Sequence, residues 1–261
     1  MGIVNVTPDS FSDGGHHAAA SQACAHCDRL VAEGVDILDI GGESTRPGSV
    51  PPSLADELDR VLPVVRHAVT LGVPVSVDTS RPEVMAAALQ AGADIVNDVR
   101  ALQWPGALAA VAAHAGAGVC LMHMHGEPAT MQQAPQYEDV LAEVAAFLGQ
   151  RLKQALAAGI AAERIVLDPG YGFGKSLEHN LALFRAQEQL LALGPPLLVG
   201  WSRKGTLGQL TGRPVDQRLP ASVGAALAAV ARGARIVRVH DVAATVDALK
   251  VWNAAGLGAA A

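Results

Sequence analysis

Acidic and amide side chains stand at the ends of several short apolar runs. Asp78, Asn97 and Asp168 each close such a run. A carboxylate at these positions would be costly to bury without hydrogen-bond donors. A divalent metal could satisfy it, or a planar ligand whose N–H-rich edge forms two hydrogen bonds with a carboxylate. Lys204 offers a cation that balances this charge or binds a ligand carbonyl. A purely structural hydrogen-bond network is the alternative.

A second group of residues suits an anion. Arg238 and His240 are two residues apart on a predicted strand, so their side chains point to the same face. A guanidinium beside an imidazole favours a phosphate or pyrophosphate group. In a closed barrel the last strand lies beside the first, which carries Asn5. The Asn5 amide oxygen could bind a Mg²⁺ ion that bridges phosphate oxygens. An ion pair between Arg238 and Asp241 is the alternative.

The first apolar run is followed by an unusually polar segment. Residues 7–15 hold two carboxylates, three hydroxyl groups and one aromatic ring, and the segment closes on two glycines. Loops that follow strands carry the chemistry in α/β proteins. We therefore predict an active-site loop here, and a second one at residues 41–48.

Two other patterns resemble sites less well. The glycine-rich stretch 170–176 resembles a phosphate-binding loop, but Pro169 stands where that motif requires glycine. His123 and His125 have the spacing of a metal pair but lack a carboxylate partner in register, so we interpret them as core or rim histidines.

These residues must be positioned by a regular alternation of apolar runs and Ala-rich stretches. Strands are predicted at residues 2–6, 36–40, 73–78, 94–97, 118–123, 164–168, 197–201 and 235–239. Helices are predicted at residues 17–34, 52–71, 82–91, 105–116, 135–158, 177–193, 217–232 and 242–254. Glycines mark the expected helix ends at Gly34, Gly72, Gly92, Gly159 and Gly233.

Eight repeated βα units predict a single (β/α)8 TIM barrel over residues 1–261, with long loops after the first two strands. The tail at 256–261 is expected to fray. A doubly wound open sheet is the alternative. In the barrel, the loops that follow the strands gather on one face, where every unit places polar residues. This arrangement indicates an enzyme.

Composition excludes several classes of protein. The net charge of −6 argues against nucleic-acid binding, and no apolar run is long enough for a membrane span. Cys24 and Cys27 have CxxC spacing but fall in a predicted helix, so we interpret them as spectator thiols rather than a redox or metal pair. We expect a cytoplasmic protein.

The motifs together resemble those of the dihydropteroate synthases. The matching stretches occur in that family's order and span nearly the whole chain: NVTPDSFSDGG (5–15), GGESTRPG (41–48), VDTS (77–80), ND (97–98), LMHM (121–124), DPGYGFGK (168–175), SRK (202–204) and RVH (238–240). The first two are the most specific. Related pterin-dependent methyltransferases share the barrel but would not be expected to carry both.

The resemblance implies a role for each candidate residue. A pterin would be bound by Asp78, Asn97, Met122, Asp168 and Lys204. The pyrophosphate would be bound by Asn5, Arg46, Arg238 and His240, with Mg²⁺ on Asn5. The p-aminobenzoate site would be formed by Phe11, Thr45, Arg46, Pro47, Phe173, Lys204 and Gly205. The catalytic residues would be Asp13, Lys204, Arg238 and His240.

The implied reaction joins 6-hydroxymethyl-7,8-dihydropterin diphosphate to p-aminobenzoate and releases pyrophosphate through a pterin cation. Sulfonamides would compete with p-aminobenzoate, and the enzyme would be a homodimer. Gly205 replaces a serine that is common in the family and helps to hold the benzoate carboxylate. The family also implies a segment before the first strand, whereas this sequence starts at that strand. A pterin-binding paralogue without coupling activity and a pterin-dependent methyltransferase are the alternative functions.

Overall fold

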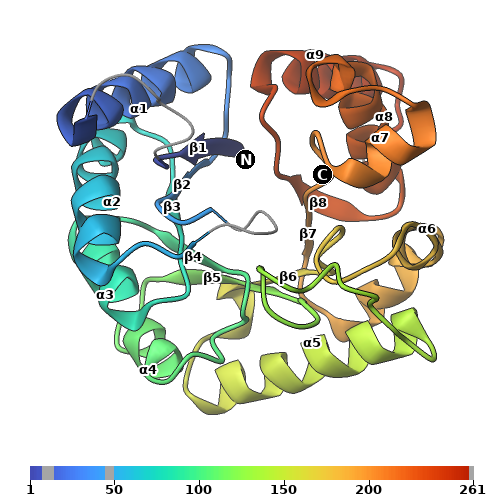
Figure 1. Cartoon of the computed structure of the whole chain (residues 1–261), viewed down its shortest axis with the longest axis horizontal. Coiled ribbons are helices and arrows are strands. Elements are labelled where there is room, and N and C mark those ends of the chain that lie inside the picture. Colours follow the sequence, from blue (N-terminus) through green and yellow to red (C-terminus); the bar gives the residue numbers. More distant parts are fainter. Residues whose placement is uncertain (8–14, 45–49, 259–261) are drawn as a thin grey trace.

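Eight parallel strands form one sheet, and neighbours along the chain are also neighbours in the sheet. In the computed structural model, which describes residues 1–7, 15–44 and 50–258 and only the backbone of 15–18, the sheet curls into a barrel (Figure 1). The strands are β1 (Gly2–Asn5), β2 (Leu38–Gly41), β3 (Val75–Asp78), β4 (Ile95–Asp98), β5 (Gly118–Met122), β6 (Ile165–Asp168), β7 (Leu197–Val199) and β8 (Ala234–Val237). The predicted (β/α)8 fold is confirmed.

The chain just after β8 pairs with β1. Gly2 and Val239 form a parallel bridge, and the Ile3 N–H donates to the Val239 carbonyl at 3.0 Å. In return, the Val239 N–H donates to the Met1 carbonyl at 3.0 Å. An open doubly wound sheet leaves its two outermost strands unpaired with each other, so that alternative is wrong.

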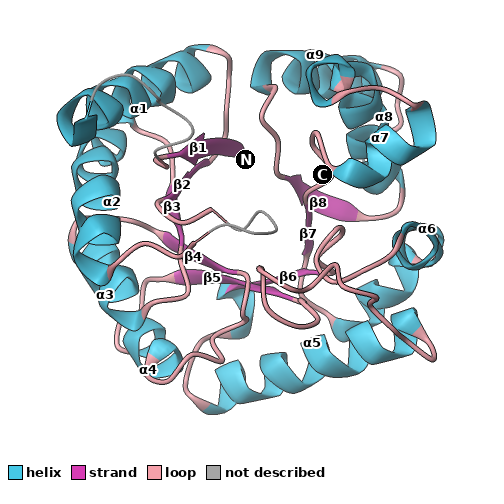
Figure 2. Cartoon of the chain, viewed as in Figure 1, coloured by secondary structure: helices cyan, strands magenta, loops and turns pink. Residues whose placement is uncertain are grey.

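Helices surround the sheet (Figure 2). They are α1 (Gly15–Ala32), α2 (Leu54–Ala68), α3 (Pro82–Gln90), α4 (Ala107–Ala112), α5 (Val140–Ala157), α6 (Leu177–Arg185), α7 (Gly205–Thr211), α8 (Leu219–Ala231) and α9 (Val242–Ala254). Short 3₁₀ segments lie at Val69–Leu71, Ala162–Arg164, Gln187–Leu193 and Val215–Gln217. Within the described residues, no helix is both long enough and apolar enough to cross a bilayer.

Local sequence signals place every helix but one, although some bounds differ: α5 begins at Val140 rather than at residue 135, and the helix predicted at 177–193 is α6 followed by the 3₁₀ segment Gln187–Leu193. The five glycines predicted to end helices all have φ between 77° and 105°, a conformation that other residues rarely adopt. The exception is α7, which lies outside the ranges predicted as helical. Its sequence contains Gly205 and Gly208, and glycine inside a helix weakens the pattern by which helices are recognised.

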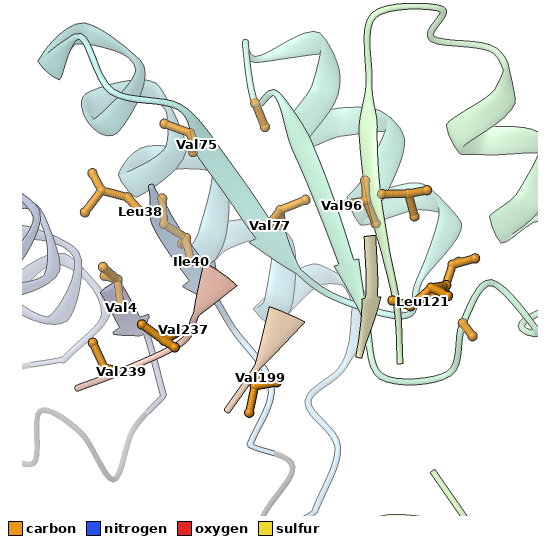
Figure 3. Packing of buried hydrophobic residues seen from close by; sticks show 14 of the residues in the cluster. Val4, Leu38, Ile40, Val75, Val77, Val96, Leu121, Val199, Val237 and Val239 are labelled. Atoms are coloured by element: carbon orange, nitrogen blue, oxygen red, sulfur yellow. The ribbon is translucent and has the colours of Figure 1, made fainter. Parts of the chain in front are cut away.

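Each strand faces two different environments. Val75 and Val77 belong to a buried cluster that also contains Val61 and Val65 of α2, and Figure 3 shows the matching residues of neighbouring strands. Because side chains alternate along a strand, the positions between them face the barrel interior. Met1, Cys120 and Leu198 form a separate apolar cluster, packed by Ile37, Val166 and Ile236. Polar residues occupy the interior above this cluster.

Candidate active site

The polar residues predicted at strand ends lie at the carboxyl-terminal mouth of the barrel. In the parallel register, Asp78 at the end of β3 is opposite Asn97 of β4. Met122 at the end of β5 is likewise opposite Asp168 at the end of β6. The four residues assigned to pterin binding on these strands therefore lie at or next to the carboxyl ends of β3 to β6, as two pairs of neighbours. The same mouth also receives Asn5, Lys204, Arg238 and His240, which end or follow β1, β7 and β8.

Arg238 joins two carboxylates, Asp39, which is fully buried, and Asp78, whose side chain is 17% exposed. Its Nε donates to Asp39 Oδ2 at 2.6 Å, and its Nη2 donates to Asp78 Oδ2 at 2.8 Å. Asn97 Nδ2 also donates to Asp39 Oδ2, at 3.2 Å. One guanidinium thus links β8 with β2 and β3 across the barrel, and it is the direct partner of the predicted pterin ligand Asp78.

Asp39 belongs to this site although it does not stand at the end of its strand. It lies on β2 before the strand end, and its side chain is fully buried. Asp39 Oδ1 and the Oγ of Ser76, which is opposite Asp39 in the register, have no hydrogen-bond partner among the described residues. Buried acceptors without donors are unusual in folded proteins. Their presence fits a site that receives N–H groups from a ligand.

The mouth perturbs the protonation of its own residues. Burial raises the pKa of Asp78 to about 7, although the charge of Arg238 opposes this shift. Burial also raises the pKa of Asp168, and Lys204 opposes it. Burial therefore makes the ionised forms of Asp78 and Asp168 less favourable in free energy. A ligand that donates hydrogen bonds to these carboxylates would offset that cost.

Lys204 connects the pterin and benzoate parts of the predicted site. Its Nζ donates to the Tyr171 carbonyl and lies 4.7 Å from the centre of the Phe173 ring. Burial lowers the pKa of Lys204 to about 8, although the charge of Asp168 acts in the opposite direction. Gly205 opens α7 directly after Lys204, so the backbone of this lysine stands at the start of the helix.

The predicted anion group is divided between two places. Asn5 and His240 line a cavity of ≈530 Å³, together with Arg29 of α1 and Arg203 of the β7 loop. Arg238 does not line this cavity because it is bound in the barrel interior. The His240 N–H donates to Ser202 Oγ at 3.1 Å, and His240 Nδ1 lies 3.0 Å from the same oxygen.

Asp241 has a different partner from the one predicted as the alternative. Its carboxylate accepts from Arg203, with Nη2 at 2.5 Å and Nε at 3.0 Å. An ion pair of Arg238 with Asp241 is therefore not the arrangement in the described structure. Arg238 remains committed to the two interior carboxylates.

Five predicted residues lie outside the described residues: Phe11, Asp13, Thr45, Arg46 and Pro47. Thr45, Arg46 and Pro47 belong to residues 45–49, and arginines bind the chain on both sides of this stretch. Arg60 donates to the Gly42 carbonyl at 3.3 Å, and Arg81 donates to the Pro52 carbonyl at 2.5 Å. Arg81 also pairs with the buried Glu57 at 3.1 Å.

The patterns interpreted as non-functional have structural roles. His123 Nδ1 accepts from Lys175 at 2.9 Å. Burial raises the pKa of Cys27 to about 12, which makes this thiol unreactive.

No group of three or more His, Cys, Asp or Glu side chains among the described residues is arranged to hold a metal ion. A larger cavity of ≈920 Å³ lies at the opposite, amino-terminal end of the barrel and contains none of the predicted site residues.

Comparison with known proteins agrees with this geometry. Residues 1–240 match the family described as "Pterin binding enzyme". The dihydropteroate synthase of Neisseria meningitidis serogroup B is 56% identical over 263 residues, which cover 98% of this chain and 92% of that protein.

Two solved structures are similar over almost the whole fold. The Xanthomonas albilineans dihydropteroate synthase with 4-aminobenzoic acid has a TM-score of 0.92 and 54% identity, covering 98% of this chain and 92% of that one. The Yersinia pestis dihydropteroate synthase with a sulfonamide drug has a TM-score of 0.93 and 47% identity, covering 98% and 93%. The chain belongs to the dihydropteroate synthase family of pterin-binding transferases.

Proposed function

We propose that the chain condenses 6-hydroxymethyl-7,8-dihydropterin diphosphate with p-aminobenzoate and releases pyrophosphate. The observation that carries this proposal is the interior acceptor site, in which Asp39 and Asp168 are buried beside Asp78, and in which Asp39 Oδ1 and Ser76 Oγ have no hydrogen-bond partner among the described residues. A pterin presents amino and ring N–H groups along one edge, which suits such a set of acceptors. The family membership supplies the reaction class.

The pterin would lie across the mouth of the barrel. Its donor edge would face Asp78, Asn97 and Asp168, and its ring oxygen would accept from Lys204. Met122, which is opposite Asp168 in the register, would pack against the ring. For this contact Lys204 must exchange the Tyr171 carbonyl for the ligand, and a lysine side chain can do so by rotation.

The diphosphate would extend from the pterin toward Asn5 and His240. These residues line the 530 Å³ cavity whose basic neighbours include Arg203. The described residues contain no multi-carboxylate metal site. A Mg²⁺ ion held largely by the diphosphate and water, with the Asn5 amide oxygen as a protein ligand, fits this donor set. When bound, the ion would supply positive charge to the leaving group.

The chemistry requires no covalent nucleophile on the protein. The C–O bond breaks with both electrons leaving on the diphosphate, and the positive charge remains on the pterin. The p-aminobenzoate nitrogen then forms the new C–N bond and loses a proton to water. His240 would stabilise the departing charge directly, and Arg238 would do so through its charge from the barrel interior, where it holds Asp39 and Asp78. The pterin cation would be stabilised by carboxylates, including Asp13 outside the described residues.

The second substrate would bind beside the pterin, against Phe173 and Lys204. Arg46 and the start of α7 would hold its carboxylate, since the first amides of a helix suit an anion. Sulfonamides, which resemble p-aminobenzoate in shape, would occupy the same place. Phe11, Thr45 and Pro47 would complete this site from outside the described residues.

A serine at position 205 is expected to strengthen this site. A Cβ added at Gly205 would meet no atom within 4 Å, so Gly205→Ser introduces a hydroxyl without a clash. A charge-assisted hydrogen bond from that hydroxyl should lower the KM for p-aminobenzoate by about 3- to 10-fold. Steady-state kinetics with the pterin substrate saturating measures this change.

Gly205→Ala is the matched control, because it adds the Cβ without the hydroxyl. Its KM should stay near that of the parent chain. Equal changes in the serine and alanine variants would contradict the hydroxyl's role and point to the backbone of the helix start.

The function itself is tested by following pyrophosphate release from the pterin diphosphate with and without p-aminobenzoate. Release that depends on p-aminobenzoate, with formation of dihydropteroate, is the expected result. Tight pterin binding without release would instead support a binding paralogue. Transfer of a methyl group from a methylated pterin would support a methyltransferase.

We also propose that the protein is a cytoplasmic homodimer, as its family resemblance implies. Exposed apolar side chains occur close together in the sequence at Leu210, Val215 and Leu219, around the end of α7 and the start of α8. Sedimentation analysis of the purified chain tests the oligomeric state.

A further inference from the structure

The loop that follows β6 is bound through its carbonyl groups. Each of the five consecutive carbonyls from Gly170 to Gly174 accepts a hydrogen bond from a side chain. Lys175 donates to Gly170 at 2.9 Å and to Phe173 at 3.1 Å. Lys204 donates to Tyr171. The two remaining carbonyls, Gly172 and Gly174, are bound from a different loop.

Those two bonds come from the segment between β5 and α5. Gln132 Nε2 donates to the Gly172 carbonyl at 2.6 Å, and the Tyr137 hydroxyl donates to the Gly174 carbonyl at 2.9 Å. The Tyr137 ring packs against His125 and His179, with ring centres 5.3 and 4.9 Å apart. Tyr137 is therefore fixed on both its ring and its hydroxyl.

The loop packs closely against the segment that follows β5. Gly170 and Gly174 have φ of 66° and 60°, and a Cβ at either would collide with the carbonyl oxygen of His123 or His125. From the other side, Asn180 Oδ1 accepts from the Gly172 N–H at 2.7 Å. The shape of the loop is thus set by close packing against His123 and His125 and by the hydrogen bonds that its carbonyl and N–H groups form.

This arrangement differs from that of a phosphate-binding loop, although the sequence of the segment resembles one. A phosphate site needs free amide N–H groups and an outward lysine. Here the N–H groups of Gly170, Gly172 and Phe173 have partners within the protein. Lys175 is only 2% exposed and points into the loop, where His123 is its third acceptor.

Phe173 is the residue through which the loop reaches the substrates. It lies between the two carbonyls bound by Gln132 and Tyr137, and its ring contacts Lys204. We propose that Gln132 and Tyr137 are positioning residues that fix the Phe173 ring and thereby set the affinity for p-aminobenzoate. This inference rests on the proposed function, in which Phe173 forms one wall of the benzoate site.

The test uses Tyr137→Phe, which keeps the ring contacts and removes one hydroxyl, and Gln132→Leu, which removes one amide. A lost hydrogen bond corresponds to about a 2- to 12-fold change in an equilibrium constant. Each variant should therefore raise the KM for p-aminobenzoate by about that factor. The kcat and the KM for the pterin diphosphate should stay within about twofold. The inhibition constant of a sulfonamide should rise in parallel with the p-aminobenzoate KM.

Gln133→Leu is the control, because the Gln133 side chain makes no hydrogen bond in the part of the chain that the structure describes. A merely structural role predicts a different pattern. A smaller folded fraction lowers the apparent kcat but leaves both KM values unchanged. An unchanged p-aminobenzoate KM in both variants, or equal rises for the two substrates, would overturn the inference. A parent chain that does not turn over would instead contradict the proposed function.

Discussion

Replacing Arg238 with methionine is expected to lower kcat/KM by roughly 10²- to 10³-fold, the usual effect of removing a preorganised electrostatic partner. The same change should destabilise the fold. Arg238 is the cation between Asp39 and Asp78, at 2.6 and 2.8 Å. Its loss leaves two buried carboxylates uncompensated, which costs about 3–5 kcal/mol in buried ion pairs. Steady-state kinetics and thermal unfolding measure the two effects.

The double variant Arg238→Met/Asp39→Asn separates them. It removes the Asp39 carboxylate, which the single variant leaves without a cation. Part of the free energy of unfolding should therefore return, while the activity stays low. A single variant as stable as the parent would contradict the account of Arg238 as the partner of buried charges.

The pH dependence of the Arg238→Met variant provides a second check. Without the guanidinium the pKa of Asp78, which burial already raises, rises further above its unfolded value. A carboxyl group with a raised pKa in the folded state contributes stability at low pH and loses it as the pH rises. The stability deficit of the variant should therefore shrink as the pH falls from 8 to 5. A deficit that grows on acidification would contradict this mechanism.

The strands and the barrel could be predicted because their signals are local. Short β-branched runs, glycine stops and Ala-rich stretches each act within a few residues, and eight repeats of the unit leave few topologies. The weak helix α7 could not be found in this way. Its two glycines reduce helix propensity, and its place is set by the loop that carries Lys204.

The partners inside the barrel were harder to predict. The two-residue spacing predicts that Arg238 shares an anion site with His240, but Arg238 binds Asp39 and Asp78 on strands more than 150 residues away in the sequence. Asp39 could have been found from the two-residue period of β2, because a charged residue between the outward-facing Leu38 and Ile40 must face the interior. Which cation meets which carboxylate depends on the tilt and closure of the barrel, and no local pattern encodes those.

The contacts of the loop after β6 could also be predicted only in part from the sequence. Its glycines and lysine are visible in the sequence, and the missing first glycine correctly argues against a phosphate site. The bonds that Gln132 and Tyr137 make to it join two loops whose separation in space only the fold determines. A side chain that binds a distant carbonyl leaves no periodic signal.

Pterin binding is expected to depend on pH as a narrow bell with its maximum between pH 7 and 8. The donor edge of a pterin requires the ionised form of Asp78, and burial raises the pKa of this carboxyl to about 7. The pterin ring oxygen requires the ammonium form of Lys204, and burial lowers the pKa of this group to about 8. Below pH 7 the carboxylate is lost, and above pH 8 the ammonium is lost. Affinity should therefore fall about tenfold per pH unit on each side.

The titration of the diphosphate would confuse this measurement, so the ligand should be 6-hydroxymethyl-7,8-dihydropterin without phosphate groups, followed by its fluorescence. Lys204→Arg keeps a positive charge above pH 8 and should remove the alkaline limb alone. Asp78→Asn should weaken binding and remove the acidic limb alone, because the amide does not titrate. Affinity that is constant from pH 5 to 9 in the parent chain would contradict the assignment of Asp78 and Lys204 as the residues that recognise the pterin. An acidic limb that persists in Asp78→Asn would shift that role to Asp168, whose pKa burial also raises.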